Sequence, residues 1–197
     1  VVLAKRSDAS EAYVFPRKCP KCDQDLIRLK SETAWRCPNY SCLEQIKGRL
    51  EYFASRGCMD IENLGEAVID QLVELGLARS IPDLYHLRFD QVLGLEGFAE
   101  KSAQNLIDAL SDSKDREFWR VLCGLGIKHV GSSASKDLAS RFGSLPALMD
   151  ASVEELLSID GVGAIMAQSI KDFFSHSENL ETTKQLIALG LRCEQAI

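Results

Sequence analysis

The sequence lacks several features that mark common functional classes. None of its apolar runs approaches the roughly 18 residues of a membrane-spanning helix, and its N-terminal Val-Val-Leu-Ala is too short for a signal-peptide core. It contains no Gly-x-x-x-x-Gly-Lys phosphate loop and no dinucleotide fingerprint. Its three histidines, His86, His129 and His176, lie far apart without neighbouring carboxylate motifs. These absences leave no convincing catalytic set and favour binding over turnover.

The charge is unevenly distributed along the chain. Residues 1–56 carry 11 Lys and Arg against 7 Asp and Glu, whereas residues 57–197 carry 12 against 22, for a net charge of −6. The basic first quarter fits contact with a polyanion. The acidic remainder would bind DNA through backbone groups and a few cations, such as Lys101 and Lys128. The alternative is that its acidic helices simply keep their faces solvated.

Four of the seven cysteines form the strongest local motif. Cys19 and Cys22 are followed, after 14 residues, by Cys37 and Cys42, which is the spacing of a zinc ribbon. Four thiolates complete a tetrahedron and leave no position for water, so we expect structural zinc, with a small hairpin over 25–36. The alternative is a disulfide or a redox Cys-x-x-Cys, which would not need the second pair. The other cysteines, Cys58, Cys123 and Cys193, are scattered, and the whole pattern predicts a reducing compartment.

The rest of the chain contains an internal repeat. Residues 92–106 and 156–170 align at an offset of 64, with Gly97 matching Gly161 and Phe98 matching Val162. Each copy predicts a short helix, a tight turn and a second helix. A helix that begins at a glycine turn offers free N–H groups and a positive dipole end to an anion, typically phosphate.

Two weaker copies have Asn-Leu-Gly at 63–65 and His-Val-Gly at 129–131 in the turn. Asn and His tolerate positive φ, so the turn is preserved. The first and third copies align at an offset of 66. This offset predicts a tandem duplication in which residues of about 58–110 form the first half and 124–175 the second. The alternative is four ordinary helical hairpins without a ligand, but four copies with small residues in corresponding places favour phosphate binding.

We therefore predict a mainly α fold: four tandem helix-hairpin-helix motifs preceded by a small zinc ribbon with four cysteine ligands. Residues 1–15 would be a tail and linker, 16–56 the zinc module and a connecting helix, and 57–197 the helical domain. Capping signatures begin at Ser80 and Ser152. A helix over 43–55 and a last helix over 180–189 are expected.

Several runs resemble a known family. The cysteine pairs, CMDIENLGEAVIDQLVELGL, LGLEGFAEKSAQNLIDAL, LGIKHVG and SIDGVGAIMAQSI are similar to the C-terminal half of bacterial NAD-dependent DNA ligases, in the same order and over nearly the whole chain. Residues 1–15 resemble the last strand of that family's oligonucleotide-binding barrel. The family seals nicks by moving AMP from NAD to a lysine in a Lys-x-Asp-Gly motif, then to the 5′-phosphate.

The resemblance implies that this chain, which has no such lysine motif and does not begin with Met, is a fragment inactive by itself. NAD and Mg²⁺ would be needed only with the missing catalytic domain, and a breast-cancer-type repeat domain would follow Ile197. The expected partner is nicked double-stranded DNA, gripped at the minor groove by a monomer that contacts no membrane, in the bacterial cytoplasm at the nucleoid. The rival functions are a protein-interaction scaffold and a lesion-binding repair module.

The expected DNA-binding residues flank the four turns. Ala99 stands where the family usually has glycine; if that position needs positive φ, alanine costs about 1 kcal/mol, which Lys101 would offset. The set is Asn63, Gly65, Gly97, Ala99, Lys101, Lys128, His129, Gly131, Gly161 and Gly163.

Overall fold

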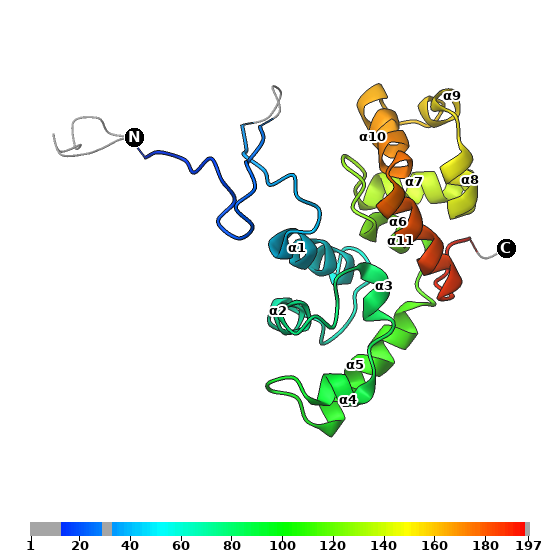
Figure 1. Ribbon diagram of the computed structural model, residues 1–197. Helices are drawn as coiled ribbons and strands as arrows, with labels where there is room; N and C mark the ends of the chain where they lie inside the picture. Colours follow the sequence, from blue (N-terminus) through cyan, green and yellow to red (C-terminus); the bar gives the residue numbers. More distant parts are fainter. Residues whose placement is uncertain (1–12, 29–32, 196–197) are drawn as a thin grey trace, which may run out of the picture. The chain divides into compact units, whose positions relative to one another are not determined.

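The computed structural model describes residues 13–28 and 33–195, which form two compact units, 1–45 and 46–197. The tail expected over residues 1–15 lies mostly outside the described residues. The described part of the chain is helical (Figure 1). Its only β-structure consists of isolated β-bridges. Its helices are α1 (Leu43–Ala54), α2 (Glu66–Glu74), α3 (Ile81–Leu84), α4 (Phe89–Leu93), α5 (Glu100–Ser113), α6 (Phe118–Gly124), α7 (Ser132–Phe142), α8 (Leu145–Asp150), α9 (Val153–Leu157), α10 (Ala164–Ser175) and α11 (Ser177–Ala188).

The first unit has almost no apolar core. The hairpin expected over 25–36 is reduced to one bridge, in which Ile27 and Arg36 exchange backbone hydrogen bonds of 2.9 and 2.8 Å. Residues 29–32 of that hairpin lie outside the described residues. Among positions 13–28 and 33–45, only Cys19 and Cys42 are buried. So small a module cannot be stabilised by apolar burial and depends on its cysteines.

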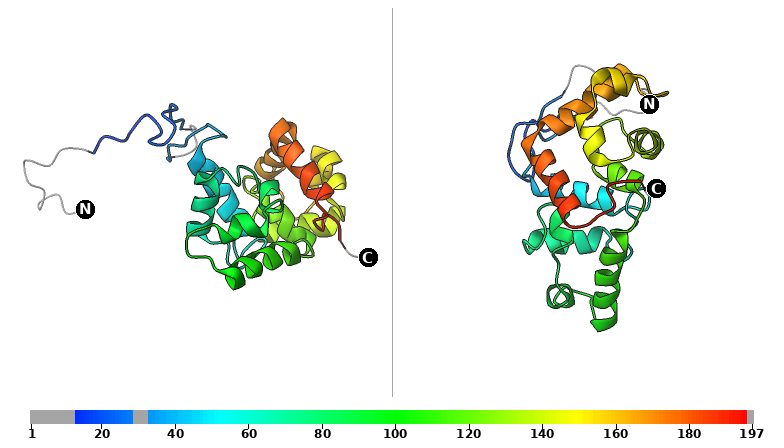
Figure 2. Two further views of the ribbon diagram at one scale, coloured as in Figure 1. Left: turned by 60° about the horizontal axis from the view of Figure 1, so that its bottom comes forward. Right: turned by 90° about the vertical axis from the view of Figure 1, so that its right-hand side faces the viewer.

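The second unit is built around one apolar core, to which residues of both 58–110 and 124–175 contribute. Leucines and isoleucines recur on one face of each longer helix, and their side chains pack together. The fully buried members include Leu50, Phe53, Ile69, Leu72, Leu106, Leu122, Leu138 and Leu156. Consecutive helices pack as pairs, α4 with α5, α6 with α7 and α9 with α10, and α10 also lies against α11 (Figures 1 and 2).

Local sequence signals mark many of the helix ends. Ser152 Oγ accepts a hydrogen bond from the Glu155 amide at 3.1 Å, and the Glu155 carboxylate accepts one from the Ser152 amide at 2.8 Å. Asp83 accepts from the Ser80 amide at 2.8 Å in the same way. Both expected caps are therefore confirmed. Among the described residues, no helix is long and apolar enough to cross a membrane.

Candidate metal centre and nucleic-acid interface

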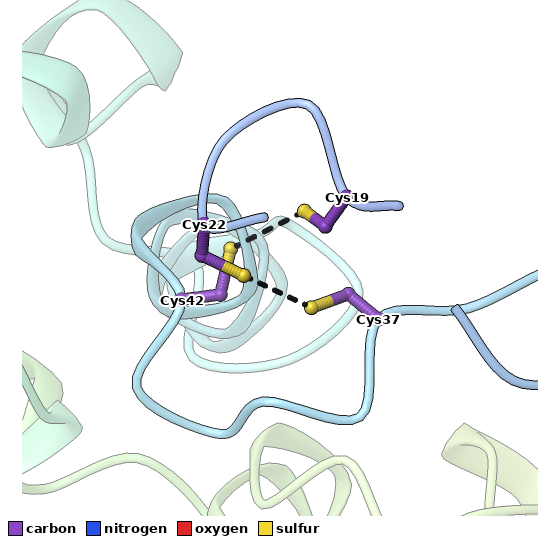
Figure 3. Close-up of side chains that lie close together, drawn as sticks. All are labelled: Cys19, Cys22, Cys37 and Cys42. Carbon is purple, nitrogen blue, oxygen red and sulfur yellow. Dashed lines mark hydrogen bonds between the residues drawn. The ribbon is translucent and has the colours of Figure 1, made fainter. Parts of the chain in front are cut away.

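The four clustered cysteines converge from two turns and a helix start (Figure 3). The first turn is closed by backbone hydrogen bonds from Asp23 to Cys19 at 2.9 Å and from Cys19 to Gln24 at 2.8 Å. Cys42 immediately precedes α1. The Sγ atoms of Cys19 and Cys42 lie 3.9 Å apart and those of Cys22 and Cys37 lie 3.5 Å apart. All four sulfurs lie within 4.8 Å of one another.

This geometry fits a tetrahedral zinc ion. A Zn–S bond of about 2.3 Å puts sulfurs about 3.8 Å apart in a regular tetrahedron, close to the observed separations. A backbone hydrogen bond at Gln24 is the main cause that lowers the pKa of Cys22 to about 7, whereas desolvation raises the pKa of Cys37 to about 12. Four thiolates cannot be packed together without a cation that compensates their charge. Cys19, Cys22, Cys37 and Cys42 are thus arranged as they would be to hold a structural zinc ion.

The four predicted hairpin turns share one backbone conformation. Their first residues, Asn63, Gly97, His129 and Gly161, have φ of 65°, 83°, 69° and 81°. Their middle residues point inward: Leu64, Val130 and Val162 are buried, and Phe98 is half-buried against the core. Their third residues, Gly65, Ala99, Gly131 and Gly163, are the N-caps of α2, α5, α7 and α10. Two non-glycine residues thus adopt the left-handed conformation that their types tolerate.

The condition under which Ala99 would be strained, a positive φ, is not met. Ala99 has φ −125° and ψ 172°, an extended conformation that any residue adopts, and its amide donates to Ser102 Oγ at 2.9 Å. The other three N-caps are extended as well. A Cβ added at Gly65, Gly131 or Gly163 would meet no atom within 4 Å. Neither the backbone angle nor the surrounding protein therefore requires glycine at these three positions.

The turns are open to solvent. Both outer residues of each turn are exposed, and no N-cap side chain bonds a first-turn amide of α2, α5, α7 or α10. At α5 the Ser102 side chain occupies the amide of the N-cap Ala99. First-turn N–H groups of a helix have no intrahelical partner and carry the positive end of the dipole. Each turn therefore presents amides that an anion could approach.

The charges around the turns differ. Glu62 and Glu66 flank the first turn, and Glu96 and Glu100 flank the second, where Lys101 is the second residue of α5. Asp160 precedes the fourth. The stretch 126–134 around the third turn contains Lys128 and no carboxylate. The third turn is thus electrostatically the most favourable for an anion.

Two segments of the chain match known families. Residues 18–43 match the NAD-dependent DNA ligase C4 zinc finger domain, and residues 120–183 match the helix-hairpin-helix motif. The chain is 46% identical over 191 residues to the DNA ligase of Carboxydothermus hydrogenoformans, covering 97% of this chain and 29% of that protein. It is 41% identical over 194 residues to DNA ligase 1 of Opitutus terrae, and this match covers 96% of this chain and 29% of that protein. Nearly the whole chain is therefore similar to the C-terminal portion of NAD-dependent DNA ligases.

The chain spans less than a third of the length of those relatives. The zinc-finger match includes all four cysteines of the candidate metal site. The helix-hairpin-helix match includes the third and fourth turns. The four turns that the sequence predicts are present among the described residues. The sequence did not predict the contact that braces the second turn. There the side chain of Gln71, in α2, bonds the backbone of Glu96, which precedes the turn.

Proposed function

We propose that this chain binds duplex DNA without sequence preference, as the clamp part of an NAD-dependent DNA ligase that seals nicks in replication and repair. One observation carries the proposal. At Gly65, Gly131 and Gly163 an exposed helix start has glycine although nothing in the chain needs it. A sugar-phosphate backbone that approaches closely enough to bond the amides would supply the missing reason.

The binding chemistry is that of backbone amides with phosphate oxygens. Such contacts position a protein on DNA and carry no base information, so affinity is independent of sequence and falls with salt. The proposed contact residues are Asn63, Gly65, Gly97, Ala99, Lys101, Lys128, His129, Gly131, Gly161 and Gly163. We expect the third and fourth turns to provide most of the affinity, because glutamates flank the first two.

The whole protein would act as a monomer on nicked double-stranded DNA in the bacterial cytoplasm, at the nucleoid. Its adenylation chemistry would need NAD, Mg²⁺ and a lysine motif that this sequence does not contain. The chain alone should therefore bind and not ligate. The zinc-bound module has a structural role, since four thiolates leave no open coordination position.

The decisive experiment is fluorescence anisotropy with a nicked duplex at two salt concentrations. In Gly163→Leu the new side chain would enter the space where phosphate is proposed. The backbone accepts it without strain, since φ is −87° and an added Cβ meets no atom within 4 Å. We expect at least about tenfold weaker binding, a loss of about 1.4 kcal/mol. Gly48→Leu on the exposed side of α1, where again no atom lies within 4 Å, is the matched control.

The same measurement separates the rival functions. An acidic scaffold, motivated by the 22 Asp and Glu of residues 57–197, should not bind the duplex at low salt. A lesion-binding module should prefer a damaged duplex to an intact one. Equal affinity of Gly163→Leu and the unaltered chain, with unchanged circular dichroism, would exclude the fourth turn as a binding site.

A further inference from the structure

Two buried cysteines outside the zinc site lie in contact. The Sγ atoms of Cys58 and Cys123 are 3.2 Å apart, and the two residues are separated by 65 positions in the sequence. Their exposed fractions are 1% and 2%. Cys58 precedes the first hairpin turn, and Cys123 lies in α6, ahead of the third. At the offset of 66, the pair Gly57-Cys58 corresponds to Cys123-Gly124, so the contact joins similar places in the two duplicated halves.

Neighbouring residues hold this contact in place. Arg120, on the same helix as Cys123, donates from Nη1 to the Cys58 carbonyl at 2.6 Å. The Tyr52 hydroxyl lies 3.7 Å from Cys123 Sγ. Because a disulfide has an S–S distance of about 2.05 Å, the two sulfurs need to approach by only a little over 1 Å to become bonded.

We propose that Cys58 and Cys123 are an oxidative modification site, a dithiol that hydrogen peroxide converts to a disulfide linking the two halves of the helical unit. One sulfur, as its thiolate, attacks a peroxide oxygen; the O–O bond breaks, and a sulfenic acid and hydroxide result. The second sulfur attacks the sulfenic sulfur, the S–O bond breaks and hydroxide leaves. Both thiol protons end in water, so two thiols and one peroxide give one disulfide and two waters.

Burial decides the rate and the selectivity of this reaction. Desolvation raises the pKa of Cys58 to about 11, so its thiolate is scarce near neutral pH. Oxidation is therefore slow and favours small oxidants during sustained exposure. The geometry makes the second step efficient, because the resolving sulfur is already in contact. Cys193, whose pKa burial raises to about 12, is a buried thiol on another segment and serves as the reference.

The disulfide would close a loop that contains the first two hairpins. Such a link removes freedom mainly from the unfolded chain, so the midpoint of thermal unfolding should rise. It would also fix the segment before the first hairpin to α6. Because neither Cys58 nor Cys123 is a proposed DNA contact, the site can exist whether or not the chain binds DNA.

The test oxidises the zinc-loaded chain with hydrogen peroxide, blocks the remaining thiols in denaturant and analyses unreduced peptides by mass spectrometry. We expect a peptide that links Cys58 to Cys123, two fewer alkylated thiols, a higher unfolding midpoint and full reversal by dithiothreitol. Cys58→Ala and Cys123→Ala should each lose the link and the shift in midpoint. Cys193→Ala should keep both.

The result on the unaltered chain decides the question even if a variant folds poorly. Full alkylation of both cysteines after oxidation would overturn the proposal. So would their conversion to sulfinic or sulfonic acids, or links from either residue to a zinc ligand. A zinc-sensitive dye, read in the same samples, shows whether the metal site was intact when the link formed.

Discussion

Gln71 holds the backbone of Glu96 through both of its amide atoms. The Glu96 N–H donates to Gln71 Oε1 at 2.7 Å, and Gln71 Nε2 donates to the Glu96 carbonyl at 3.3 Å. The contact braces the second hairpin turn from α2, which belongs to the first. The corresponding residue in the other half is Asp137, whose carboxylate cannot donate, so this brace is specific to one half.

Replacing Gln71 by alanine should loosen the second turn. Alanine is a good helix former, so the loss reflects the two hydrogen bonds, about 1 kcal/mol of unfolding free energy. Hydrogen exchange at the Glu96 amide should accelerate. The control is Gln104→Ala, which removes only a surface pair with Asp108 at 2.8 Å; equal effects of the two substitutions would contradict the bracing role.

Gly124→Ala should destabilise the helical unit. An added Cβ would lie 2.6 Å from a ring carbon of Phe53, which is fully buried. Overpacking of this kind costs about 1–3 kcal/mol, whereas Gly48→Ala, in the exposed middle of α1, should stabilise by up to about 1 kcal/mol. Urea unfolding of the two variants measures the difference, and a stabilising effect at both positions would count against close packing of α6 on Phe53.

Zinc removal should unfold the first unit and spare the second. Metal binding supplies about 10 kcal/mol or more of folding free energy in comparable sites. The first unit buries little apolar surface that could stabilise it without the metal. The helical unit has its own core. After treatment with a chelator, proteases should cut within residues 16–42 while the helical circular dichroism largely persists. Loss of most helical signal would show that the two units fold as one.

The cap of α9 should make stability depend on pH. The pKa of Glu155 is lowered, chiefly because its carboxylate accepts a hydrogen bond from the Ser152 amide. Its charge therefore stabilises the fold above the unfolded pKa of about 4.3, and this contribution is lost as pH falls through the lower folded pKa. Glu155→Gln keeps an acceptor without the charge, so its unfolding midpoint should be lower at pH 7 and converge with the unaltered chain in acid.

Lys128→Gln should reduce the salt dependence of DNA binding. If Lys128 contacts a phosphate, its loss lowers the slope of log affinity against log salt by about 1 and weakens binding on every sequence. Lys184→Gln, in α11 and outside the four turns in the sequence, removes the same charge as a control. Identical slopes for the two variants would show that Lys128 affects binding only through the overall charge of the protein, without contacting a phosphate.

Local residue types account for what the sequence predicted well. The cysteine spacing specified the metal site, and Gly, Asn and His marked the left-handed position of each turn. The sequence left open whether position 99 needs a positive φ, and the structure shows an extended N-cap there. The Gln71–Glu96 brace and the Cys58–Cys123 contact join residues 25 and 65 positions apart. Such pairs depend on tertiary packing, and no regular spacing of residues in the sequence indicates them.

The left-handed positions alternate between a polar residue and glycine: Asn63, Gly97, His129 and Gly161. Copying a block of two unlike hairpins produces this order, whereas copying a single hairpin three times would not. We therefore propose that each turn is related most closely to the turn two positions away along the chain, not to its immediate neighbour. Substitution tolerance measured at the first turn should be compared with the third, and that at the second with the fourth.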